Sequence, residues 1–68
     1  MSDMALVIAA AIESLESPAQ KAAAIHHFMA GDLGSAVLVL AAPAQMYARY
    51  DDLLRIAFLA GMAAQLES

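Results

Sequence analysis

Two adjacent histidines, His26 and His27, stand shortly before Asp32 in a chain otherwise rich in alanine and aliphatic residues. Imidazole and carboxylate groups bind metal ions and transfer protons, which makes this stretch the first candidate for chemistry. Neighbouring residues on a helix point about 100° apart, whereas two histidines that share an ion lie three or four residues apart. We therefore expect the histidines to be structural or solvent-facing near the negative end of a helix, without a metal or a cofactor.

Adjacent carboxylates at Asp51 and Asp52 are the second candidate, because a carboxylate pair supports acid and base catalysis. On a helix these two side chains face different directions, and the sequence has no cysteine, no serine-elbow motif and no glycine-rich phosphate loop. We expect both aspartates to lie on solvent-exposed helix faces. Asp51 is expected to form an ion pair with Arg55, four residues further along the helix. The sequence therefore predicts no catalytic residues, and we expect a protein that is not an enzyme.

A cluster of aromatic and basic residues is the best candidate for binding another protein. Tyrosine and arginine are enriched at protein interfaces, because each offers a large contact area with a polar end. For either tyrosine taken alone, the alternative to partner binding is packing at the edge of the core, with the hydroxyl group in solvent. The predicted partner-binding residues are Met46, Tyr47, Arg49, Tyr50 and Arg55.

Helices must position all of these residues, since no segment alternates apolar and polar residues as a strand would. Apolar spacing predicts helices over residues 4–15, 18–30, 33–41 and 44–66, with Ser2 or Asp3 as the first cap. On the helix 18–30, the residues expected on the buried side are Ala22, Ile25, Phe28 and Met29. The helix 33–41 is apolar nearly all round, so we expect it to be the central and most buried element.

The helix boundaries have specific local signals. Ser17 can cap the helix that Pro18 opens, with Gln20 reaching back to complete a capping box, so Ser17→Asp is expected to be nearly neutral. Gly31 is a natural left-handed C-cap, and Asp32 can cap the next helix. Pro43 predicts a break near residue 42, although a kink is the alternative. The last segment is either continuous from residue 44, which we favour, or divided by a new cap at residues 50–52.

The last helix carries apolar residues on more than one face, which gives it one surface for the core and one for a partner. Small residues recur along it at spacings of three and four, which lets a second helix approach closely. We expect a homodimer through this helix. The predicted dimer interface consists of Leu53, Leu54, Ala57, Phe58 and Gly61.

Composition limits the remaining classes of function. The 68 residues are 63% apolar and carry a net charge of −4, with no cysteine. This predicts a single all-α domain over residues 1–68, a hairpin or small bundle of three to four helices completed by homodimerisation. Three strong cations are too few for a nucleic-acid surface, and the apolar runs are too short to span a membrane, so we expect a cytoplasmic protein.

The function expected from these properties is a small acidic protein-binding module that modulates or inhibits a partner protein. The size and composition also suggest a narrower function. Such a module could be encoded by a phage or mobile element and inhibit a regulator or defence system of the host. The alternatives are a helix-turn-helix-like DNA-binding protein and a membrane-active helical protein. The identity of the partner stays open.

Overall fold

Helices account for nearly all of residues 3–67, the part of the chain that the computed structural model describes. In chain order they are α1 (Asp3–Glu13), α2 (Pro18–Met29), α3 (Leu33–Ala41), the short 3₁₀-helix η1 (Ala44–Tyr47) and α4 (Ala48–Glu67). These described residues form no strand, so the prediction of an all-α chain is confirmed. Ser2, one of the two caps expected for the first helix, lies outside the described residues.

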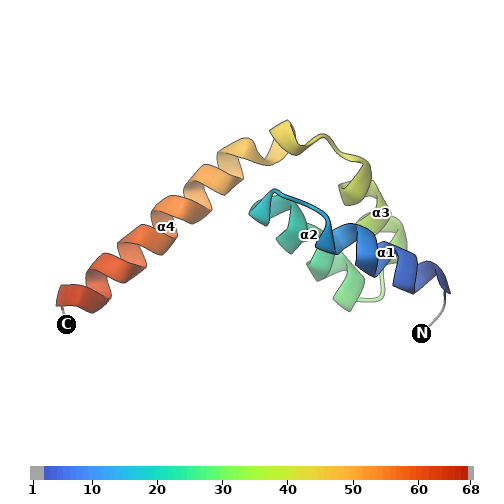
Figure 1. The fold of residues 1–68 in the computed structure, drawn as a ribbon, viewed down its shortest axis with the longest axis horizontal. Coiled ribbons are helices and arrows are strands. Elements are labelled where there is room, and N and C mark those ends of the chain that lie inside the picture. The colour runs from blue at the N-terminus through green and yellow to red at the C-terminus, as the bar shows by residue number, and fades with distance from the viewer. Residues whose placement is uncertain (1–2, 68) are drawn as a thin grey trace.

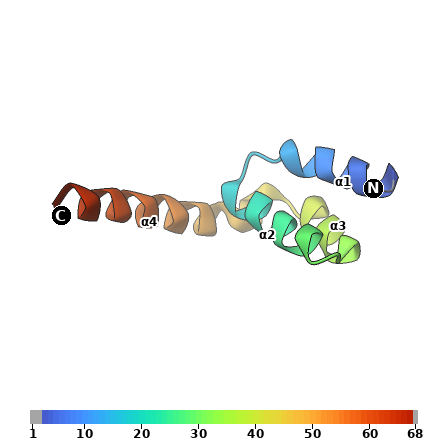
Figure 2. The same ribbon diagram turned by 90° about the horizontal axis from the view of Figure 1, so that it is seen from below.

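The first three helices form a small bundle, and α4 leaves it as a long arm (Figure 1). The view turned by 90° also shows α4 running away from the other three helices (Figure 2). The Cα radius of gyration is 14.5 Å and the extents are 47 × 25 × 17 Å. A compact chain of this length has a radius of about 11 Å. The excess reflects the arm, which contacts only α2 and η1 within the described residues.

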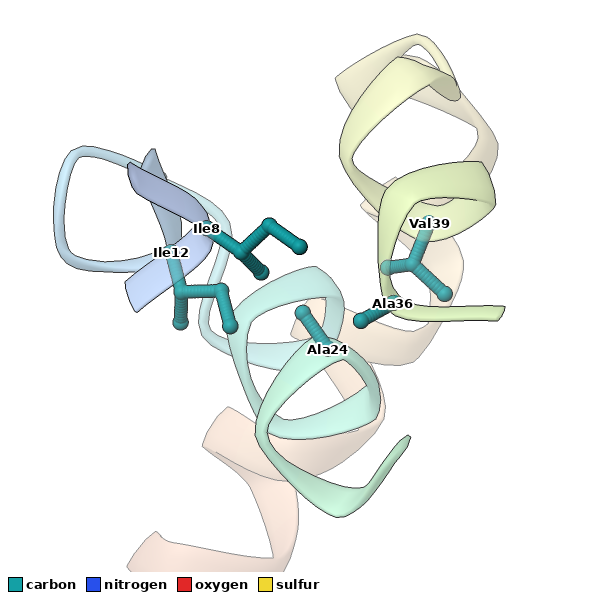
Figure 3. Packing of buried hydrophobic residues seen from close by; sticks show 5 residues of the cluster. All are labelled: Ile8, Ile12, Ala24, Ala36 and Val39. Carbon is teal, nitrogen blue, oxygen red and sulfur yellow. The ribbon is translucent and has the colours of Figure 1, made fainter. Parts of the chain in front are cut away.

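The core is a single small cluster between α1, α2 and α3 (Figure 3). Ile8 and Ile12 of α1 point towards Ala24 of α2, and Ala36 and Val39 of α3 close the cluster from the other side. Ile8 and Ile12 lie four residues apart, on the face that the apolar spacing predicted. Alanine at two central positions lets the helices approach closely, but it also means that little apolar area is buried.

The central element is α2, and the prediction that residues 33–41 would be the most buried helix is wrong. α2 contacts α1, α3, η1 and α4, whereas α3 contacts only α1 and α2. Leu38 of α3 is 73% exposed because none of the elements within residues 3–67 covers the outer side of that helix. The face assigned to α2 is right for Phe28, which packs against the core, and wrong for the rest: Gln20 and Ala24 are the buried residues, while Met29 is 78% exposed.

The start of α2 confirms half of the predicted capping box. The Ser17 hydroxyl accepts a hydrogen bond from the Gln20 backbone N–H at 3.1 Å, and Pro18 occupies the first helical position. The Gln20 side chain does not reach back. Its amide instead donates to the carbonyls of Val39 and Ala42, at 2.9 and 2.8 Å. The last carbonyls of a helix lack the usual i+4 donors, and that of Val39 otherwise accepts from the Ala42 N–H, so Gln20 completes the C-terminal cap of α3 from the neighbouring helix.

The turn between α2 and α3 has the predicted capping residues. Gly31 has a φ of +80°, its N–H donates to the Phe28 carbonyl, and the N–H of Asp32 donates to the His27 carbonyl. This pair of hydrogen bonds is a Schellman motif, in which glycine tolerates the left-handed conformation. Asp32 then caps α3 by accepting from the Ser35 N–H at 3.0 Å.

Pro43 breaks the chain between α3 and α4, as predicted. Ala42 is extended, with φ −71° and ψ 142°, which is the conformation that a following proline favours. The chain then enters η1 and continues directly into α4, because Ala48 at the junction is helical. The continuous form of the last segment is therefore confirmed from Ala48 onward, and its first turn is a 3₁₀-helix.

Candidate functional site

An open apolar groove of about 800 Å³ lies between α2 and the first half of the arm. One side is formed by α2 and the other by η1 and α4. The lining residues are Ala19, Ala22, Ala23, Met46, Tyr47, Tyr50, Leu53, Leu54 and Ala57. We call this surface the α2–α4 groove. It combines residues from two sets that the sequence predicted separately, three for partner binding and three for dimerisation.

The aromatic side of the groove is formed by Met46, Tyr47 and Tyr50. Tyr47 is half-buried and packs against the core, so it anchors η1 to the bundle. Tyr50 is 58% exposed and Met46 is 64% exposed. The two tyrosine rings lie 6.4 Å apart at 53°, a tilted arrangement typical of aromatic pairs. Core-edge packing therefore describes Tyr47, whereas Tyr50 presents its ring to the groove.

The opposite side is a low wall of three alanines on α2, namely Ala19, Ala22 and Ala23. The absence of longer side chains here leaves the groove open. None of these three alanines was predicted as a site residue; Ala22 was expected only on the buried side of its helix. Their only signal was the spacing of small residues at three and four along α2, which places them on one face.

Asp51 holds the arm at the entrance to the groove. Its carboxylate accepts hydrogen bonds from the Ser17 hydroxyl at 2.9 and 2.8 Å and from the Ala19 N–H at 2.8 Å. The predicted ion pair between Asp51 and Arg55 is wrong, because Asp51 points to the positive end of α2 instead. Arg55 lies 3.4 Å from Asp52, and both side chains are largely exposed.

The structure does not bring the two arginines into the groove. Arg49 is exposed, and Arg55 lines a second depression together with Pro18 and Phe58. Of the predicted partner-binding residues, the groove therefore contains Met46, Tyr47 and Tyr50 only.

The predicted dimer residues are all exposed, as an unoccupied interface requires. Leu53 and Leu54 are 55% and 48% exposed and line the groove together with Ala57. Phe58 lies outside it and is 68% exposed. No atom outside its own helix lies within 4 Å of a Cβ placed on Gly61. None of the residues of α4 is buried, so the part of the expectation that gave one of its faces to the core is wrong.

The histidines and Asp32 form the other polar cluster. His26 is exposed and His27 half-buried, with their rings 5.4 Å apart and edge-on, in the last turn of α2. Residues 3–67 include no group of three or more His, Cys, Asp or Glu placed to hold a metal ion. Hydrogen bonds from the hydroxyl and the N–H of Ser35, with a smaller contribution from His27, lower the pKa of Asp32. This carboxylate is a helix cap.

No protein-family model matches this chain, and neither does any curated protein or solved structure with which it was compared. Within residues 3–67, every helix falls short of the length or the apolar character that crossing a membrane requires.

Proposed function

We propose that this protein is a non-enzymatic binding module that accepts an apolar helix in the α2–α4 groove and thereby modulates the protein that carries the helix. The observation that carries the proposal is the groove itself, which is lined almost entirely by apolar side chains and is open along one side. Helix-in-groove recognition uses such a surface, with anchors at three- and four-residue spacings.

Three features support a protein ligand. Tyr50 offers a large exposed ring at the groove, and tyrosine is a common hot-spot residue. Exposed methionine at Met46 adapts to different partner side chains. The alanine wall on α2 leaves space for the ligand's side chains to enter between the two helices. A small module that occupies a helix of a regulator blocks whatever that helix otherwise contacts, which is a simple route to inhibition.

The test is affinity capture from an extract of the source cells, followed by reconstitution of the complex from purified components. We expect Tyr50→Ala to weaken binding of the captured protein by about thirtyfold, which corresponds to about 2 kcal/mol for a hot-spot side chain. Leu38→Ala is the matched control, because it removes an exposed apolar side chain from α3, outside the groove. Equal loss of affinity in both variants, or none in either, contradicts binding through the groove.

A further inference from the structure

The C-terminal half of α4 lies away from the bundle with its apolar side chains in solvent. Figures 1 and 2 show this half leaving the other helices. Every one of residues 58–67, which make up this half, is exposed. A helix segment of this length is only marginally stable in water without packing, so its apolar surface calls for a covering element.

The exposed area is large enough to form a stable interface. The accessible surface of the chain is 5107 Å², whereas a folded monomer of 7.1 kDa exposes about 4,100 Å². The excess of about 1,000 Å² is close to the ~800 Å² that each partner contributes to a standard protein interface. One further chain of similar size, seated along the arm, would bury it.

Side-chain size along the groove-facing side of α4 changes at Ala57. Before this residue the side carries large side chains, Tyr50, Leu53 and Leu54, which line the groove. After it, the same side continues with small residues only. At three- and four-residue spacings these are Ala60, Gly61 and Ala64.

We propose that the α2–α4 groove is occupied by α4 of a second copy of this chain, antiparallel and related by a two-fold axis at Ala57. In this register Leu53 faces Gly61 of the second copy, Leu54 faces its Ala60, and Tyr50 faces its Ala64. The small-residue half of each arm enters the groove of the other copy, opposite the alanine wall of α2. The proposal rests on the proposed function, because both assign the groove to an apolar helix. The second copy and a partner helix therefore compete for the groove, and a partner binds the chain that the dimer releases.

One half of α4 carries large side chains and the other half small ones, so two copies can fit each other. This arrangement favours a second copy over an unrelated partner. An antiparallel pair places every large residue opposite a small one twice, whereas a parallel pair places large against large. An unrelated partner would need only one half of this pattern on α4. Charge complementarity also supports this register, because it brings Arg49 near Glu67 of the second copy. Within residues 3–67, Arg49 forms no ion pair of its own.

The test is sedimentation equilibrium of the full chain and of Gly61→Leu. A Cβ at position 61 has open space around it, and leucine favours the helix over glycine, so the variant stays folded. The added leucine side chain blocks the close approach of Leu53 from the second copy. We expect the dissociation constant of the dimer to rise at least tenfold, which corresponds to about 1.4 kcal/mol of overpacking. Ala63→Leu is the matched control: it adds the same side chain about 160° around the helix and should leave the dimer intact.

The double variant Leu53→Ala/Gly61→Leu exchanges the large and small positions and should restore the dimer. A wild-type monomer up to about 100 μM, a dimer that survives Gly61→Leu, or a double variant that stays monomeric would each overturn this inference. A monomer that still binds another protein in a Tyr50-dependent way overturns only the inference. Loss of both activities overturns the proposed function as well.

Discussion

The Ser17 hydroxyl and the Asp51 carboxylate, separated by 34 residues in the sequence, lie within hydrogen-bond distance at 2.9 and 2.8 Å. The same hydroxyl accepts from the Gln20 N–H, while Asp51 also accepts from the Ala19 N–H. A carboxylate of α4 therefore completes the N-terminal cap of α2, where the helix dipole favours negative charge. Because α4 makes few other contacts with the bundle, this cap sets where the arm departs and how wide the groove is.

Replacing Asp51 by alanine should lower the free energy of unfolding by about 1.5–3 kcal/mol, the range for hydrogen bonds to a charged group. The Ser17 cap of Gln20 survives, so α2 still forms while the arm loosens. Asp52→Ala is the matched control, since Asp52 only pairs with an exposed arginine at 3.4 Å and should cost less than about 0.5 kcal/mol. Urea melts measure both, and equal losses would show that the Asp51 contacts contribute nothing specific.

The structure reverses the expectation for Ser17→Asp. Aspartate is a good cap in isolation, but here it would place a second carboxylate against Asp51 and remove the hydroxyl donor. Two like charges near 4 Å repel by about 1–4 kcal/mol, so we expect destabilisation of that order. The double variant Ser17→Asp/Asp51→Asn removes the repulsion and should recover most of the loss. A single variant as stable as the wild type would argue against this arrangement.

The helix boundaries could be predicted because each depends on residues next to one another in the chain. Ser17, Gly31, Asp32 and Pro43 act through backbone groups at most five residues away. The partners of Gln20 and Asp51 could not be predicted, because both residues have an equally good local role. Gln20 fits a capping box and Asp51 an i, i+4 ion pair; in each case a helix end elsewhere in the fold supplies the actual partner.

The candidate site was predicted in part for the same reason. Met46, Tyr47 and Tyr50 lie close together in sequence and come together in the groove. The alanines of α2 that face them are distant in sequence and carry no distinctive chemistry, so only the packing of α2 against α4 identifies them. The burial of α3 was overestimated because an apolar composition shows what a helix needs to bury and says nothing about which elements are present to cover it.

Gln20→Leu should destabilise the fold by about 1–3 kcal/mol. Gln20 is 2% exposed and donates to two carbonyls at the end of α3, so leucine leaves these buried acceptors without that donor. Gln20→Glu should be at least as costly, since a carboxylate cannot donate at neutral pH. The same change at the exposed Gln45 serves as the control, with an expected effect below about 0.5 kcal/mol. Equal losses of stability for Gln45→Leu and Gln20→Leu in thermal melts would contradict the capping role of the Gln20 side chain.

Asp32 should titrate below its ordinary pKa, because its charged form accepts hydrogen bonds from the Ser35 hydroxyl and N–H. A depressed folded-state pKa means that the contribution to stability is present above the ordinary value near 4 and is lost as the pH falls through the lower folded value. Carbon-detected NMR titration measures the midpoint. Ser35→Ala should raise the midpoint, whereas the control Ser14→Ala, just after α1, should leave it unchanged. An unchanged midpoint in Ser35→Ala would show that the Ser35 hydroxyl does not lower the pKa of Asp32.

Hydrogen exchange should show an arm whose protection depends on protein concentration. In a monomer, the amides of residues 59–67 belong to the exposed end of a helix, and exposed helix ends open at little free-energy cost. Association through α4 stabilises only the helical form, so their protection should rise between about 1 μM and 200 μM. The α2 amides near the core residue Ala24 report the stability of the bundle and serve as the internal reference. In Gly61→Leu, exchange of residues 59–67 should be the same at both concentrations. Weak, concentration-independent protection of the wild-type arm would mean that no second copy covers it in this range.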